Sequence, residues 1–330
     1  MQRRSLMLAA LAGQSTLALP AIAQPAARQV RIGWLTGQRQ ASIAPYLATF
    51  REGMAAAGYV EGRNLTIEYR YGDEDISRVP ALAQELASLP VSVLMVQGVA
   101  TQVAQLGLKI PVAYVMSADP VIAGLATSLA HPSRNMTGLT FMAAELNSKR
   151  LEMLRDIVPG LRQVAVIGNP EHAGEELERA ASRETGQRLG LEVTFNATRS
   201  IAELERALRG IAASRSQAVS VFADGFALQH RQLLADFALQ HRLPLISGWS
   251  LFAEAGALCI YGPRLRESYR RLAYYVDRML RGAQPADLPI ERPTVFEFVV
   301  NQKTANAIGA TIPQHLMALA DRVIEGEGGR

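Results

Sequence analysis

The sequence predicts an α/β protein of two lobes, each built from a parallel sheet that helices cover on both faces. From residue 30 onward, short apolar runs rich in β-branched residues alternate with amphipathic helical stretches. Nearly continuous apolar strands separated by helices are typical of buried parallel sheets. The alternation occurs as two successive series, and 330 residues are more than one hydrophobic core usually serves. These observations together favour two lobes over a single sheet.

The first series begins with an apolar strand over 30–35. Leu47, Phe50 and Met54 recur at helical spacing, which predicts a helix over 45–58. The same alternation then predicts strands over 65–71, 91–96 and 112–116 and helices over 79–89 and 101–108.

The second series follows the same rhythm. It predicts strands over 164–167, 191–195, 218–222 and 245–246 and helices over 175–189, 201–213 and 227–241. Between the two series, 137–141 is a short extended segment and a candidate crossover. After the second series we expect a strand over 257–261, a helix over 265–280 and a strand over 294–300. These late elements indicate that the chain crosses between the lobes more than once.

The first 23 residues have the order of parts of a cleaved secretory signal peptide. Arg3 and Arg4 precede an apolar stretch that ends near the small-residue triplet Ala21-Ile22-Ala23. The arginine pair is compatible with Sec or twin-arginine export, and the cleavage site has no cysteine to carry a lipid. No other segment is long and apolar enough to span a bilayer. We therefore expect an exported, periplasmic protein that is not lipidated.

Composition argues against several classes of partner and cofactor. The formal net charge is +4, but the 34 basic residues are scattered alongside 30 acidic ones, so no nucleic acid is expected. The one cysteine, Cys259, excludes an intramolecular disulfide and a multi-cysteine metal cluster. We expect no metal and no cofactor.

Motifs of the common catalytic classes are absent from the sequence. There is no G-x-x-x-x-G-K-[ST] loop, no G-x-G-x-x-G after the first strand, no H-E-x-x-H, no G-x-S-x-G and no C-x-x-C. No histidine stands beside an obvious nucleophile, although a Ser-His-Asp set could still assemble in space. We therefore do not expect an enzyme.

The carboxyl ends of the predicted strands are the candidate site, because ligands bind there in parallel α/β sheets. Hydroxyls, amides, aspartates and aromatic rings at these ends suit a small organic solute such as a zwitterion. Structural roles remain open for several of them: Asp119 and Asn169 in turns, Asp224 as a helix cap and Trp34 in the core. For Thr36, Gln97 and Ser117, a structural role and a ligand contact are equally open. The candidate residues are Trp34, Thr36, Gln97, Gly98, Ser117, Asp119, Asn169, Asp224, Trp249 and Tyr261.

Several segments together resemble a known family. They are 110–121 (IPVAYVMSADPV), 135–140 (NMTGLT), 149–159 (KRLEMLRDIVP), 261–263 (YGP), 275–289 (YVDRMLRGAQPADLP) and 296–305 (FEFVVNQKTA). The sequence is similar over 30–325 to ABC transporter substrate-binding proteins, a family that includes tryptophan/tyrosine-binding proteins. The resemblance implies a periplasmic binding protein type I fold, with two Rossmann-like lobes, a three-crossover hinge and ligand capture by hinge closure. It places 24–142 and 253–288 in the N-terminal lobe and 143–252 and 289–330 in the C-terminal lobe.

The resemblance also implies a function. It predicts a monomeric solute-binding protein that delivers a small organic molecule, such as an amino acid or an aromatic compound, to an inner-membrane ABC permease. Members that look like amino-acid binders tend to carry Thr-Pro or Ser-Pro around 97–100, whereas this chain offers Gln97, with Asp224 and Phe226 later in the sequence. Two alternatives remain at this point: a ligand-sensing module for a receptor, and a hydrolase on the same scaffold.

Overall fold

The computed structural model describes residues 29–132, 135–172 and 174–326. The expected signal peptide over 1–23 lies outside the described residues. Within these ranges, no helix is long and apolar enough to cross a membrane.

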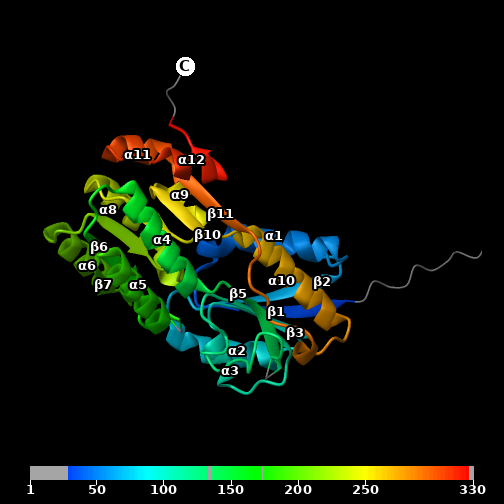
Figure 1. Cartoon of the computed structure of the whole chain (residues 1–330). Coiled ribbons are helices and arrows are strands. Elements are labelled where there is room, and N and C mark those ends of the chain that lie inside the picture. Colours follow the sequence, from blue (N-terminus) through cyan, green and yellow to red (C-terminus); the bar gives the residue numbers. More distant parts are fainter. Residues whose placement is uncertain (1–28, 133–134, 173, 327–330) are drawn as a thin grey trace, which may run out of the picture.

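The first lobe is a five-stranded parallel sheet with helices on both faces (Figure 1). The strand order is β2-β1-β3-β4-β5. Apolar side chains from alternate positions of the strands pack on α1 and α10 at one face and on α2 and α3 at the other. The elements are β1 (Val30–Thr36), α1 (Gln40–Ala56), β2 (Leu65–Tyr71), α2 (Val79–Ser88), β3 (Val93–Gln97), α3 (Ala100–Ala104), β4 (Val112–Met116), β5 (Met136–Thr140) and α10 (Leu265–Leu280).

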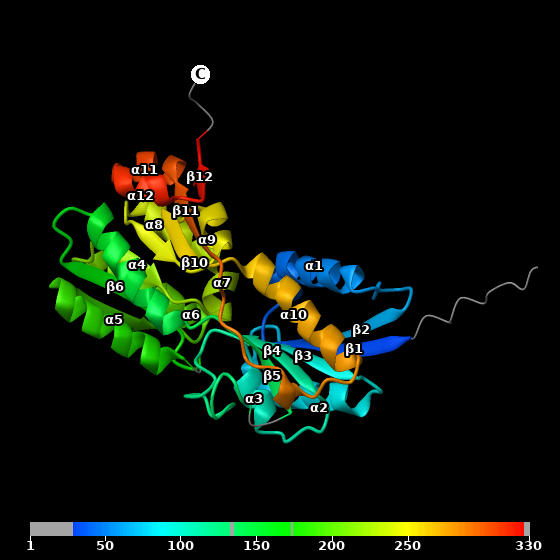
Figure 2. The ribbon, with the colours of Figure 1, turned by 45° about the vertical axis from the view of Figure 1, so that its right-hand side comes forward.

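The second lobe is a seven-stranded sheet in the order β12-β11-β10-β9-β8-β6-β7. α4, α11 and α12 pack on one face, with α5 beside α4, and α6, α8 and α9 pack on the other (Figure 2). The elements are α4 (Ala143–Ile157), β6 (Gln163–Gly168), α5 (Glu175–Leu189), β7 (Glu192–Ala197), α6 (Ile201–Ala213), β8 (Ala218–Val221), α7 (Gly225–Gln229), α8 (Arg231–Gln240), β9 (Leu245–Ser247), α9 (Ser250–Ala255), β10 (Cys259–Pro263), β11 (Phe296–Asn301), α11 (Gln302–Ile308), α12 (Gln314–Leu319) and β12 (Arg322–Ile324).

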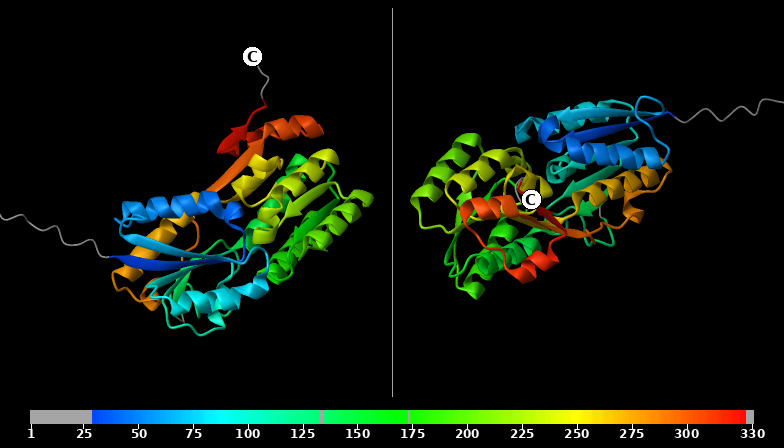
Figure 3. Two further views of the ribbon diagram at one scale, coloured as in Figure 1. Left: turned by 180° about the vertical axis from the view of Figure 1, so that it is seen from behind. Right: turned by 90° about the horizontal axis from the view of Figure 1, so that it is seen from above.

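Three chain segments join the lobes, as seen from behind and from above in Figure 3. The first segment follows β5, the second follows β10 and the third precedes β11. One residue from each, Phe141, Arg264 and Val295 respectively, lines the same surface hollow. The segments therefore lie side by side and form the hinge.

Two lobe boundaries differ from those expected. β10 pairs with β9 and β11 in the second lobe, so the chain returns to the first lobe after Pro263 and not at residue 253. Ile290 still packs in the first-lobe core, and Glu291 bridges to Leu139 of β5. The last crossing therefore follows Glu291 and not residue 288.

The β10–β11 pair is the one antiparallel pair of strands in the described sheets, where we expected parallel strands alone. β10 ends at the hinge because the chain leaves there for α10, and β11 begins at the hinge because the chain returns there. Pro263 consequently lies opposite Phe296 in the register, and the two strands run in opposite directions.

Several helices also differ from the expectations. α1 begins at Gln40 and contains Pro45, which we expected at the helix start. The helix expected over 227–241 is divided into α7 and α8 at His230. α4, α9, α11, α12 and β12 have no counterpart among the expected elements.

Candidate functional site

A cleft lies between the two lobes at the carboxyl ends of β1, β3, β4, β6 and β8. It encloses about 1070 Å³ of space, part of it open to solvent, which is the scale of a small-molecule site. Its apolar walls include Phe141, Phe226 and Tyr269. The polar lining residues are Gln38, Tyr46, Glu74, Gln97, Thr101, Gln102, Ser117, Asn169, Glu171, His172, Arg199, Asp224, Gln229 and Trp249.

Six of the ten candidate residues line this cleft: Gln97, Gly98, Ser117, Asn169, Asp224 and Trp249. Gly98 has φ of 75°, a left-handed conformation that favours glycine, and it turns the chain from β3 into α3. The structure thus brings together residues from three sequence segments of the second lobe and two of the first.

Trp34 and Thr36 do not line the cleft, although β1, which contains both, is followed directly by the lining residues Gly37 and Gln38. Trp34 is fully buried under α1 and α10, with its ring 5.1 Å from Phe50 and 6.3 Å from Tyr269. Thr36 is also fully buried, and its hydroxyl accepts a hydrogen bond from the Gln38 amide at 3.2 Å. These side chains shape the wall behind the cleft.

Asp119 and Tyr261 also lie outside the cleft lining. The Asp119 carboxylate accepts the amide hydrogens of Val121 at 2.7 Å and Ile122 at 3.3 Å, so it stabilises a turn. Tyr261 is in the middle of β10 and not at its end, and its ring stacks on Phe296 at 6.2 Å. The strand therefore continues two residues past the position at which we expected it to end.

Several lining residues were not candidates from the sequence. Tyr46 is in the interior of α1, and it reaches the cleft because its ring stacks on Tyr269 of α10 at 5.1 Å. Gln38, Glu74 and His172 are in loops after β1, β2 and β6. The position after a strand end was the available signal for these loop residues, whereas no sequence signal marks Tyr46.

Asp224 is the buried acidic group of the cleft. Its Oδ1 accepts the Ala227 amide hydrogen at 2.9 Å and caps α7, which is the structural role that the sequence left open for Asp224. Its Oδ2 has no hydrogen-bond partner among the described residues. Burial raises the pKa of Asp224 to about 6, against the opposing effect of nearby backbone amides. The carboxyl group both caps a helix and offers a free acceptor to the cleft.

Three further polar atoms, on cleft-lining side chains that are almost fully buried, have no hydrogen-bond partner among the described residues. They are Gln97 Oε1, Tyr46 OH and Trp249 Nε1. Each of these side chains is less than a tenth exposed. A buried polar group without a partner costs free energy, so a ligand that pairs with these groups is bound more tightly for that reason.

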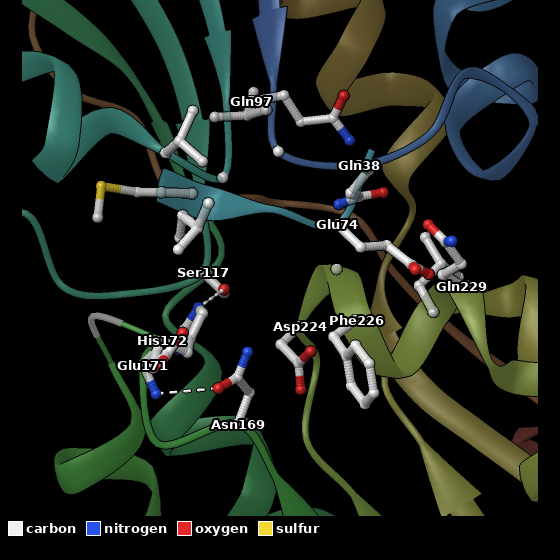
Figure 4. A pocket seen from close by; sticks show the side chains of 18 of the residues that line it. Gln38, Glu74, Gln97, Ser117, Asn169, Glu171, His172, Asp224, Phe226 and Gln229 are labelled. Carbon is white, nitrogen blue, oxygen red and sulfur yellow. Dashed lines mark hydrogen bonds between the residues drawn. The ribbon is translucent and has the colours of Figure 1, made fainter. Parts of the chain in front are cut away.

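Ser117 and His172 meet across the cleft from opposite lobes (Figure 4). Ser117 Oγ is 2.6 Å from His172 Nε2, and the Gly174 amide donates to His172 Nδ1 at 3.1 Å. Burial lowers the pKa of His172 to about 4, so the ring is neutral at pH 7. Beside them, the Asn169 amide oxygen accepts from the Glu171 amide at 3.0 Å.

A buried polar chain supports this wall from behind. Arg150 is fully buried and donates from Nε to the Tyr261 carbonyl at 2.8 Å and from Nη1 to Asn147. Asn147 in turn donates to Glu178 Oε2 at 3.0 Å. Burial raises the pKa of Glu178 to about 8, and Glu178 Oε1 is 3.6 Å from His172 Nδ1. This chain fixes α4, α5 and β10 relative to each other below the cleft.

Further contacts between the lobes show that the described conformation is closed. The Ser42 hydroxyl donates to Gln229 Oε1 at 3.1 Å, and Glu74 Oε1 is 3.2 Å from His230 Nε2. A β-carbon on Gly225 would lie 2.3 Å from the side-chain amide nitrogen of Gln38, so the Gln38 side chain of the first lobe lies directly against the start of α7 in the second. Among the described residues, no group of three or more His, Cys, Asp or Glu side chains could hold a metal ion.

Comparison with known proteins agrees with this architecture. A relative described as a tyrosine-binding protein, from Clostridioides difficile, is 21% identical over 268 residues, which are 78% of this chain and 75% of the relative. A solved conserved domain protein from Vibrio cholerae has a TM-score of 0.84 and 21% identity, covering 90% of this chain and 100% of its own. A solved ABC domain in complex with L-Trp, from Streptococcus pneumoniae, has a TM-score of 0.82 and 20% identity over the same shares.

These structural likenesses show the fold, a periplasmic binding protein type I fold of two α/β lobes. The model of the family described as ABC transporter substrate binding protein matches residues 41–324, which is most of the chain. This protein therefore belongs to the ABC transporter substrate-binding protein family.

Proposed function

We propose that this protein is the periplasmic solute-binding component of an ABC importer. It captures a small organic solute, an amino acid or an aromatic compound, in the interlobe cleft and delivers it as a monomer to an inner-membrane permease. The observation that carries the proposal is the set of buried, unpartnered polar atoms from both lobes that face one closed cleft. The tyrosine-binding relative and the L-Trp complex support the choice of solute class.

The cleft chemistry supports a solute with a donor group at one end and an apolar body. Asp224 Oδ2 is placed to accept from an ammonium or amide group. Trp249 Nε1 is a donor only, so it requires an acceptor on the solute. Phe141 and Phe226 provide apolar surface for a ring or an aliphatic chain.

A hydrolase would need a nucleophile within hydrogen-bond reach of a base, and Ser117 and His172 satisfy that distance. The tautomer of His172 argues against this role. Nδ1 accepts the Gly174 amide hydrogen, so in the neutral ring the proton is on Nε2. An imidazole that donates to the serine oxygen cannot take the serine proton, and Glu178 is too far from Nδ1 for a hydrogen bond. The pair is therefore better suited to binding than to acyl transfer.

The test is thermal unfolding of residues 24–330 with a panel of amino acids, aromatic acids, peptides and small carboxylates. Carried-over ligand is first removed by partial unfolding and refolding. Solute at one hundred times Kd stabilises the folded protein by about 2.7 kcal/mol. We expect one solute class to stabilise the wild type. The same solutes should stabilise the control Asp119→Asn equally, because Asp119 lies outside the cleft lining, and should stabilise Trp249→Phe much less. Turnover of a panel compound that Ser117→Ala abolishes would contradict the proposal.

A further inference from the structure

The direction of the hydrogen bond between Ser117 and His172 determines what the serine can offer to a solute. Because the His172 proton is on Nε2, Ser117 Oγ accepts in this pair. The serine hydroxyl proton is then left to point elsewhere. Ser117 lines the cleft, and its hydroxyl makes no other hydrogen bond to the described residues. The proton is therefore available to the cleft interior.

The His172 ring is held in this orientation from behind. The Gly174 amide occupies Nδ1 at 3.1 Å, and Glu178 Oε1 lies 3.6 Å from the same nitrogen on the side of α5. The His172 side chain is 15% exposed, and burial keeps it neutral. The ring consequently cannot exchange its donor and acceptor nitrogens without losing the backbone hydrogen bond.

The pair also depends on closure of the lobes. Ser117 follows β4 of the first lobe, and His172 follows β6 of the second. Their hydrogen bond exists only when the two lobes are together. In an open form the Ser117 hydroxyl has its proton and both acceptor lone pairs available, whereas in the closed form His172 Nε2–H occupies one lone pair and the proton points away from His172, toward a third group.

We infer that His172 is a positioning residue that, on closure, fixes the Ser117 hydroxyl as a donor to an acceptor oxygen of the solute, a carboxylate or a carbonyl. The inference rests on the proposed function, because it assumes a solute in the cleft. On this inference, the hydrogen bond between Ser117 and His172 makes the protein prefer solutes that have an acceptor oxygen over solutes that lack one. The acceptor end of the solute lies at Ser117, and its donor end lies at Asp224.

The test compares L-tryptophan with tryptamine, which has the same ring and amine but no carboxylate, by titration calorimetry. The measured quantity is the ratio of the two Kd values, because effects on closure alone cancel in it. Ser117→Ala and His172→Phe should each reduce the preference for L-tryptophan by about tenfold or more. His172→Gln, whose amide nitrogen can take the place of Nε2, should keep the preference within about threefold. An unchanged ratio in Ser117→Ala would overturn the inference.

A second readout does not need a solute. The His172 signal in the ¹⁵N imidazole spectrum is assigned by its absence from the spectrum of His172→Gln. In the wild type, we expect the imidazole proton of His172 on Nε2, both with and without L-tryptophan. A proton on Nδ1, or a ring that titrates near its ordinary pKa in both samples, overturns the inference. If no panel compound binds the wild type, the proposed function fails, and the spectrum of the ligand-free protein still decides the role of His172.

Discussion

Asp224→Asn should make the ligand-free protein more stable and a worse receptor. Asparagine retains the Oδ1 acceptor that caps α7 and replaces the free Oδ2 by an NH₂ group. Burial raises the pKa of Asp224 from 3.8 to about 6, which corresponds to about 3 kcal/mol. The unfolded chain ionises near 3.8 and the folded chain near 6, so the wild type loses this stability as pH rises through that window. The variant should therefore gain up to about 3 kcal/mol at pH 7 and nothing below about pH 4.

Binding should change in the opposite direction. A hydrogen bond from a cationic donor to a buried carboxylate contributes about 1.5–3 kcal/mol, so Kd for L-tryptophan should rise roughly 10- to 100-fold. Urea unfolding at pH 7 and pH 4 measures the stability, and titration calorimetry at pH 7 measures the affinity. Asp119→Asn is the matched control and should change neither by much. A variant that is less stable than the wild type at pH 7, or that binds as tightly, would refute the reasoning.

Three further predictions concern fluorescence, pH and packing. With L-tyrosine as ligand, Trp249→Phe should abolish the change in intrinsic fluorescence, whereas Trp34→Phe should keep it and lose about 2 kcal/mol of stability because Trp34 is in the core. Affinity should fall from pH 6.5 toward pH 4, because closure requires a neutral His172 and because the Asp224 carboxylate becomes protonated below about pH 6; His172→Gln should make the fall shallower in titrations over that range and leave the part due to Asp224. Gly262→Ala should lower the free energy of unfolding, measured in urea, by at least about 2 kcal/mol, because the added β-carbon would lie 1.9 Å from a backbone carbonyl oxygen. The control Gly210→Ala adds a β-carbon in open space on α6 and should slightly raise Tm.

The sequence pattern located the cleft because of one geometric property of parallel sheets. Strands that run in the same direction end at the same edge, so Gln97, Ser117, Asn169 and Asp224 meet although they are far apart in the chain. The prediction that Tyr261 lies at the end of a strand was wrong. The apolar pattern predicted that this strand ends at residue 261, whereas β10 continues to Pro263.

Other parts of the site depend on packing that no local pattern encodes. Tyr46 reaches the cleft through its contact with Tyr269, a residue more than 200 positions later in the chain. The lobe in which β10 lies is set by its pairing with β9 and β11, and alternation of apolar residues carries no information about the choice of sheet. The meeting of Ser117 and His172 requires both lobes to be closed, so it was visible only in the structure.

The most direct test of the account is a crystal structure of the protein with the solute that stabilises it most. The account predicts the solute between the lobes, with a donor group on Asp224 Oδ2 and an acceptor oxygen within hydrogen-bond distance of Ser117 Oγ. A solute bound outside the interlobe cleft, or found cleaved at Ser117, would contradict it.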